Sequence, residues 1–267
     1  MIDFDAINVW GRQLDDVLLP IVSSAVLEKM RAQKFEYVED AREMLFKLTE
    51  RDQIVDTVLA WLRSGQLAAY HGSRLTDDDV IAIRENGLQP LSSLSRRERL
   101  TRALSPHPQW ADAKVRLDGV LEEFGNGDRA GRREGQVHLT LSRSGLLNTF
   151  NHYLTHGAEF DQHVAENLLG QEGLDLLSCD GKPRVIKVTV PGPDALASAH
   201  PFFRIDDLRS RGDLPNLVSD FIDSWSYRLS EPDFQSHTLH VDSGMMFYEV
   251  VPNDWIVDVE TIALKEE

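Results

Sequence analysis

The chain has 267 residues and a formal charge of −16, from 28 Lys and Arg residues against 44 Asp and Glu residues. This length suits one large domain, or one domain with a helical extension, and we expect the second arrangement. The acidic balance argues against a general, sequence-independent grip on nucleic-acid backbones.

A single cysteine, Cys179, excludes an internal disulfide and favours a reducing, cytoplasmic location. The first residues are acidic, unlike a signal peptide, and no apolar run reaches membrane-spanning length, so no membrane partner is expected. The nine histidines lack a metal-ligand spacing, which predicts that the protein holds no metal.

The first part of the chain, residues 1–65, is predicted to be helical, and its last helix is expected to be capped by Thr49 and to end at Gly65. A short apolar run at residues 67–70 then predicts a strand that leads into a turn at His71-Gly72-Ser73. A glycine beside a histidine exposes backbone groups to a ligand and adds an imidazole that can bond a hydroxyl. This corner is therefore a candidate small-molecule site.

The next segment carries the clearest helix signal, because Thr76 can cap a helix whose first turn holds three aspartates and whose end is Gly87. Two further helices are predicted at residues 95–104 and 111–124. The glycine-rich, charged residues 125–135 are expected to form a mobile loop, of a kind that often contacts ligands when it lies beside a pocket; a disordered connection is the alternative.

The remaining elements alternate less regularly. Strands are predicted at 137–141, 184–190, 202–205, 245–251 and 255–259, and helices at 146–169 and 217–229. Helices and strands are segregated rather than strictly alternating, which predicts an α+β fold.

Three separated segments carry chemistry. They are Tyr70-His71-Gly72-Ser73, then Val137-His138-Leu139-Thr140 followed by Tyr153 and Gly157-Ala158-Glu159, and lastly Phe247-Tyr248-Glu249-Val250-Val251-Pro252. Their order resembles the ADP-ribosyltransferase fold of the histidine–tyrosine–glutamate class, with local similarity to the rifampin ADP-ribosyltransferases and to poly-ADP-ribose-polymerase-like catalytic domains. The resemblance covers residues 67–262. It implies a split β-sheet catalytic core over residues 66–267, preceded by a helical extension over residues 1–65.

The resemblance further implies a transferase that cleaves the nicotinamide–ribose bond of NAD and passes ADP-ribose to an acceptor. Its catalytic residues would be His71, Tyr153 and Glu249. NAD would be held by His71, Gly72, Ser73, Arg74, His138, Leu139, Thr140 and Tyr153. A carboxylate close to the ribose would stabilise the positive charge that develops there in the transition state.

Two assignments stay open. The tyrosine of the family's second strand is His138 here, so either His138 or Tyr153 would stack on nicotinamide. The acidic residue is expected to be Glu249, which alternates with Met245 and Phe247 on a predicted strand; Asp254 is the alternative, and a structural ion pair is a third reading of Glu249. For Glu159 the first expectation is a helix-surface carboxylate paired with an arginine, and the alternative is that it points at the cleft.

The leading hypothesis is an ADP-ribosyltransferase of the kind that serves as a bacterial or phage toxin or defence effector. Its acceptor would be a protein, a nucleic acid or a small molecule, and a cognate antitoxin or regulator would be a further partner. The alternative is a non-catalytic module that binds NAD, ADP-ribose or a partner protein. An NAD-dependent RNA 2′-phosphotransferase ranks third, because its phosphate needs several cations and the sequence shows no such set beside His71.

Overall fold

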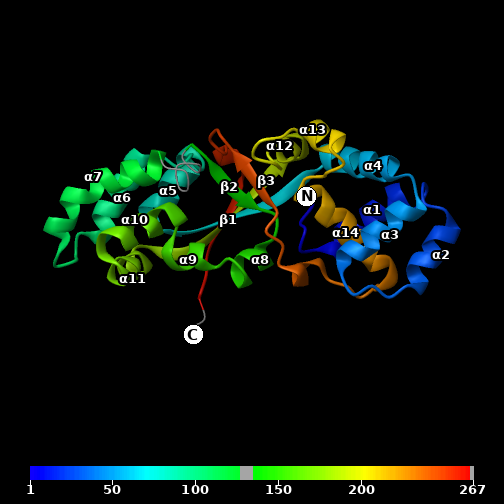
Figure 1. The fold of residues 1–267 in the computed structure, drawn as a ribbon, viewed down its shortest axis with the longest axis horizontal. Helices are drawn as coiled ribbons and strands as arrows, with labels where there is room; N and C mark the ends of the chain where they lie inside the picture. Colours follow the sequence, from blue (N-terminus) through cyan, green and yellow to red (C-terminus); the bar gives the residue numbers. More distant parts are fainter. Residues whose placement is uncertain (127–134, 265–267) are drawn as a thin grey trace. The chain divides into compact units, whose positions relative to one another are not determined.

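The computed structural model describes residues 1–126 and 135–264 (Figure 1). The predicted loop at 125–135 therefore lies largely outside the described residues. The chain forms two compact units. The first unit contains residues 1–69, 139–149 and 189–245, and the second contains residues 70–138, 150–188 and 246–267. A domain boundary was predicted after residue 65. In the structure, the first unit joins the N-terminal helices to two later segments.

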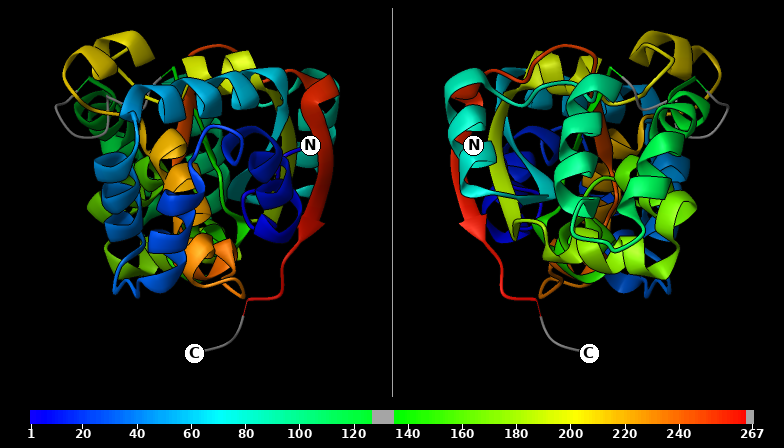
Figure 2. Two further views of the ribbon diagram at one scale, coloured as in Figure 1. Left: turned by 90° about the vertical axis from the view of Figure 1, so that its right-hand side faces the viewer. Right: turned by 90° about the vertical axis from the view of Figure 1, so that its left-hand side faces the viewer.

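The first unit is mainly helical. Its elements are α1 (Ile7–Leu18), α2 (Ser24–Ala32), α3 (Val38–Leu48), α4 (Arg51–Ser64), α8 (Arg143–Asn148), α12 (Gly192–Ala197), α13 (Ile205–Ser210), α14 (Asn216–Ser230) and η2 (Ser236–Leu239). α14 packs beside α3, as the views in Figure 2 also show. Edge-to-face contacts of Phe221 with Phe4, Trp10 and Trp61 form the aromatic centre of this unit. Burial of large aromatic rings removes much apolar surface from water and so stabilises this unit.

The second unit carries the candidate site. Its helices are α5 (Asp77–Asn86), α6 (Ser93–Leu104), α7 (Trp110–Asn126), α9 (His152–His156), α10 (Glu159–Leu169), α11 (Gln171–Cys179) and η3 (Asn253–Trp255). Four of them, α6, α7, α10 and α11, bury a common apolar core that includes Leu104, Leu121, Phe160 and Leu177. A Cβ at Gly173 would lie only 2.4 Å from the Ala165 carbonyl oxygen, so the close approach of α11 to α10 requires this glycine.

Five strands form one sheet in the order β4-β2-β1-β3-β5. Their bounds are β1 (Gln66–Leu75), β2 (Val137–Thr140), β3 (Lys182–Pro191), β4 (Gly244–Phe247) and β5 (Ile256–Thr261). β3 and β5 are antiparallel, with Arg184 opposite Thr261 and Ile186 opposite Val259. The α+β class predicted from the sequence is confirmed by this sheet and the surrounding helices.

Several predicted elements are confirmed. The cap at Thr76 is a full capping box, because its hydroxyl accepts from the Asp79 N–H and the Asp79 carboxylate accepts from the Thr76 N–H. The strand at 184–190 and the helix at 217–229 also form.

Other predictions are wrong. Thr49 does not cap α4, since its hydroxyl donates to the Leu45 carbonyl at 2.7 Å and Glu50 holds the cap position. Residues 202–205 form no strand, and Phe202 is exposed, while Ile205 begins α13. The His71-Gly72-Ser73 segment is not a turn but the middle of β1, which runs on to Leu75.

Candidate active site

A hollow of about 90 Å³ in the second unit brings together most of the predicted chemistry. Its polar lining comes from β1, β2 and the residue before it, α6 and the segment before it, and the α9–α10 segment. The polar residues are His71, Gly72, Ser73, Gln89, Arg96, Gln136, His138, Tyr153 and Glu159. Apolar side chains including Leu88, Leu91 and Phe160 line the rest. Convergent polar groups in an otherwise apolar hollow are usual marks of a ligand site, and typical ligand pockets are larger, roughly 300–1,000 Å³.

His71 is fixed in one orientation by the neighbouring strand. Its Nδ1 lies 2.9 Å from the backbone carbonyl oxygen of His138. Because a carbonyl only accepts, Nδ1 carries the proton. Burial lowers the pKa of His71 more than this hydrogen bond raises it, and the charge of Arg96 lowers it further. The imidazole is therefore neutral at pH 7, and its Nε2 is an acceptor for a ligand hydroxyl.

Tyr153 and Glu159 form a hydrogen-bonded pair within the lining of the hollow. The Tyr153 hydroxyl donates to a Glu159 carboxylate oxygen at 3.0 Å, and Nε2 of His152 lies 3.4 Å from the same oxygen. The His152 and Tyr153 rings are 4.1 Å apart. α9 ends at Gly157, whose φ of 85° turns the chain so that α10 begins two residues later at Glu159. The turn places the carboxylate in the hollow.

Glu249 lies elsewhere. β4 ends at Phe247, so the predicted strand through residue 251 is too long and Glu249 does not share a strand face with Met245. Glu249 is exposed and is not among the residues that line the hollow in the described chain, and the same holds for Asp254. The carboxylate beside His71 and Tyr153 is Glu159, for which the sequence analysis expected an arginine-paired surface role.

Of the predicted NAD-binding residues, some line the hollow and others lie outside its described lining. His71, Gly72, Ser73, His138 and Tyr153 line the hollow. Leu139 and Thr140 are buried and belong to the first unit. Arg74 is buried, and its guanidinium donates to the carbonyl oxygens of Asp180, at 3.2 Å, and Gly181, at 2.6 Å. Arg74 thus serves to join β1 to the start of β3, and burial lowers its pKa.

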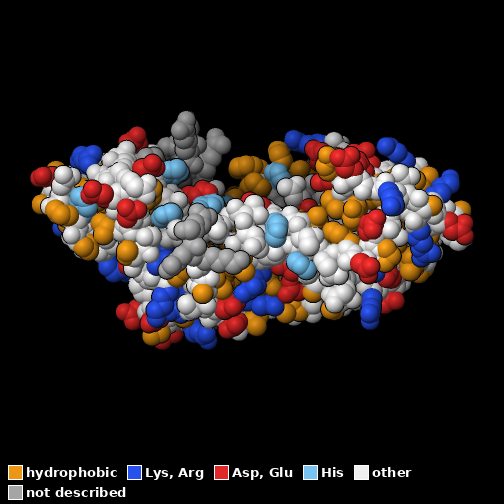
Figure 3. Space-filling model, turned by 90° about the horizontal axis from the view of Figure 1, so that it is seen from below, with side chains coloured by type: hydrophobic (Ala, Val, Ile, Leu, Met, Phe, Trp, Pro, Cys, Tyr) orange, Lys and Arg blue, Asp and Glu red, His pale blue; other side chains and the backbone are white. Residues whose placement is uncertain are grey.

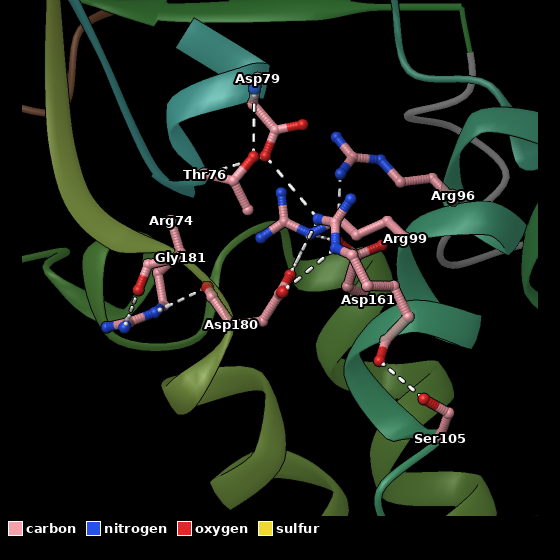
Figure 4. A network of polar contacts seen from close by, with 10 residues as sticks. Arg74, Thr76, Asp79, Arg96, Arg99, Ser105, Asp161, Asp180 and Gly181 are labelled. Carbon is pink, nitrogen blue, oxygen red and sulfur yellow. Dashed lines mark hydrogen bonds and ion pairs between the residues drawn. The ribbon is translucent and has the colours of Figure 1, made fainter.

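The sequence reading that no cations gather beside His71 is wrong. Arg96 lines the hollow, and Arg99 and Arg102 follow it one and two turns later on α6. Figure 4 shows the guanidinium groups of Arg96 and Arg99 with Asp79, Asp161 and Asp180. The pattern Arg96-Arg97-Glu98-Arg99 was visible in the sequence, but which arginines face inward depends on how α6 packs.

Among the described residues, no group of three or more His, Cys, Asp or Glu side chains is placed to hold a metal ion. Nor does the described chain contain a helix with the length and apolar character to cross a membrane. On the face drawn in Figure 3, acidic and basic side chains are interspersed.

Comparison of the chain with protein-family models, with curated proteins and with solved structures finds no match.

Proposed function

We propose that the second unit is an NAD-dependent ADP-ribosyltransferase whose site is formed by His71, Tyr153 and Glu159, on an ADP-ribosyltransferase-like core. The observation that supports this most is that these three side chains and Gly72, which come from two segments far apart in the sequence, line one hollow. The residue types match the histidine–tyrosine–glutamate class, with Glu159 in the role that the sequence analysis gave to Glu249.

The chemistry follows from the properties of each group. The bond between the ribose C1′ and the nicotinamide nitrogen breaks, and nicotinamide leaves as a neutral molecule with the bonding electron pair. Positive charge then develops on the ribose. The Glu159 carboxylate would stabilise that charge more strongly in the transition state than in the ground state, which lowers the barrier. An acceptor nucleophile forms the new bond to C1′ and gives its proton to the same carboxylate.

The other two residues would orient the substrate. Neutral His71 offers Nε2 to a ribose hydroxyl, because its Nδ1–H is already held by His138. The ring of Tyr153 offers a face for nicotinamide, and stacking of this kind adds on the order of 1 kcal/mol. The hydrogen bond from Tyr153 keeps Glu159 in place. Holding ribose and carboxylate in register is itself a large source of rate enhancement.

The test is release of nicotinamide from labelled NAD, with transfer of label to acceptors in a cell lysate. We expect Glu159→Gln to lower release roughly 100-fold or more, since the neutral amide cannot balance the developing charge. Glu166→Gln is the matched control, because Glu166 lies on the same helix and is exposed. Equal loss in both variants, or no release by the wild-type protein with any acceptor pool, would contradict the proposal.

A binding module without catalysis is the second candidate. It is favoured by the exposed position of Glu249, outside the lining of the hollow in the described chain. Calorimetry with NAD separates the two functions, because a module would bind NAD and leave it intact. Glu249→Gln adds a direct comparison: loss of nicotinamide release in this variant, with Glu159→Gln active, would return the catalytic role to Glu249. A toxin or defence role with a cognate regulator, and a cytoplasmic location, belong to the transferase proposal.

A further inference from the structure

A second, wider hollow continues from the first one. Its volume is about 360 Å³. Six residues line both hollows, namely His71, Ser73, Leu88, Gln89, Leu91 and Arg96. Arg99 and Arg102 from α6, and Asp79 and Glu98, complete the charged lining of the wider hollow. A ligand seated beside His71 therefore has room to extend toward the arginines of α6.

Arg96 and Arg99 depend on the same buried carboxylate. Nη1 of Arg96 lies 3.1 Å and Nε of Arg99 3.3 Å from the same oxygen of Asp161, whose side chain is fully buried. Arg99 is itself buried, and removal from water lowers its pKa although Asp161 and Asp180 act in the opposite direction. One carboxylate thus serves two guanidinium groups.

Around Asp161, buried donors without a hydrogen bond outnumber buried acceptors without one among the described residues. Nε of Arg96 and both Nε and Nη2 of Arg99 are buried and lack a hydrogen bond among the described residues, whereas the one unpaired acceptor of the group is Oδ1 of Asp161. If Oδ1 took one of these donors after a small rotation, two would still lack an acceptor. Buried donors without a partner are costly, so this arrangement favours an added acceptor.

Arg102 and Asp79, the charged neighbours of Arg96 and Arg99, already have partners. Arg102 donates from Nε and Nη2 to the two oxygens of Asp180, at 3.2 and 3.1 Å. Burial opposes ionisation of Asp79, but hydrogen bonds from Thr76 and the charge of Arg102 outweigh it and hold the Asp79 pKa below its ordinary value. Asp79 is thereby bound to the start of α5, and Glu98 is exposed. Within the described part of this network, the buried donors that lack a hydrogen bond belong to Arg96 and Arg99.

We propose that Arg96 and Arg99 form a phosphate-binding site in the wider hollow, so that the molecule bound there carries a phosphate or diphosphate group. A phosphate group presents several acceptor oxygens, and the planar guanidinium group matches them in pairs. This inference does not require cleavage of NAD. The phosphate could belong to a dinucleotide that also occupies the His71 hollow, or to a second molecule that receives the transferred group.

Binding of inorganic diphosphate, measured by calorimetry on the full-length protein, tests the proposal. We expect the wild-type protein to bind it, and Arg96→Gln to bind it roughly tenfold more weakly or worse. Arg97→Gln is the matched control, because Arg97 is the adjacent residue, is half exposed and pairs with Asp118 on the surface. Arg96→Lys keeps the charge beside Asp161 and should give an intermediate affinity. Thermal unfolding of each variant shows whether it is folded.

The proposal is overturned if diphosphate does not bind the wild-type protein, or if Arg96→Gln and Arg97→Gln weaken binding equally. Competition then identifies the source of the phosphate. Displacement of NAD by diphosphate assigns the site to the dinucleotide, whereas simultaneous binding assigns it to a phosphorylated acceptor. Failure of nicotinamide release with diphosphate binding intact would reject the transferase proposal and leave this site standing.

Discussion

The two units bury carboxylates in opposite ways. In the second unit, Asp161 is surrounded by cations, since both Arg96 and Arg99 reach one of its oxygens. In the first unit, Asp220 and Asp223 lie one turn apart on α14, and Arg42 contacts Asp223 at 2.9 Å. The first arrangement leaves donors in excess and suits an anionic ligand. The second leaves acceptors in excess and suits bound protons.

The excess of carboxylates in the first unit appears in their pKa values. Burial raises the pKa of Asp220 to about 6, against the hydrogen bond from Ser243. Burial raises the pKa of Asp223 to about 7, against the charge of Arg42, and repulsion from Asp220 and Glu39 adds to the rise. The ratio of cations to buried carboxylates, rather than burial alone, therefore decides whether a cluster holds protons or needs an anion.

The largest effect is expected at Asp161. Asp161→Asn leaves Arg96 and Arg99 without their shared counter-charge, and loss of one partner from a buried ion pair costs roughly 3–5 kcal/mol of unfolding free energy. Denaturant unfolding measures this cost. Asp118→Asn is the control, because its pair with Arg97 is exposed and should contribute less than about 1 kcal/mol. Similar losses in the two variants would show that Asp161 is not essential to the arginine network.

The second prediction concerns pH. Asp223 keeps its proton in the folded protein up to about pH 7, whereas in the unfolded chain it loses it near its ordinary value of 3.8. The stability of the first unit should therefore fall as pH rises from about 4 to about 7, with Asp223 contributing roughly 3–4 kcal/mol to that fall. Asp220 should act in the same direction up to about pH 6.

Asp223→Asn sharpens this prediction, because an amide of the same shape cannot ionise. Its unfolding free energy, followed by tryptophan fluorescence, should fall much less over this pH range than that of the wild-type protein. Trp10, Trp61 and Trp225 all report on the first unit. A wild-type stability that rises between pH 4 and 7 would contradict the prediction. The same profile in Asp223→Asn and in the wild type would assign the effect to other groups.

The smallest effect is expected at Gly157. Its φ of 85° strains any other residue, and a Cβ there would lie 2.9 Å from Nη2 of Arg99. Gly157→Ala should cost about 1–3 kcal/mol from the backbone alone, with a further cost for moving Arg99. Gly170→Ala is the matched control, because Gly170 has a φ of 62° with no atom close to the added Cβ. Equal costs would show that Arg99 moves aside freely.

Local signals predicted the helices and strands that have clear ends. Thr76 with its aspartates and Gly87 specify α5, and the apolar run of β3 specifies a central strand. β1 is longer than predicted. It lies between β2 and β3, and because it pairs with a strand on both sides, it continues through the polar residues His71 and Ser73. β4, which lies at the edge of the sheet, is shorter than predicted. α11 was missed because Gly170 and Gly173 resemble helix breakers, whereas here one ends α10 and the other permits close packing.

The site was predicted where strands deliver its residues. His71, Gly72 and His138 were found because short motifs mark β1 and β2, and Tyr153 because it follows the same motif. Arg96 and Glu159 sit on helices, and which side of a helix faces a hollow depends on packing between segments far apart in sequence. That information is absent from local pattern, which is why the carboxylate expected in the hollow was Glu249 and not Glu159.

The lone thiol of this chain lies at a useful position. Cys179 is exposed at the end of α11, directly before the aspartate that holds Arg102. A fluorophore attached there would sit within a residue of the charged network without any engineered substitution. Its emission, read during titration with an anion, would reveal ligand-driven rearrangement of the network in real time, and an alkylated sample would supply the blank.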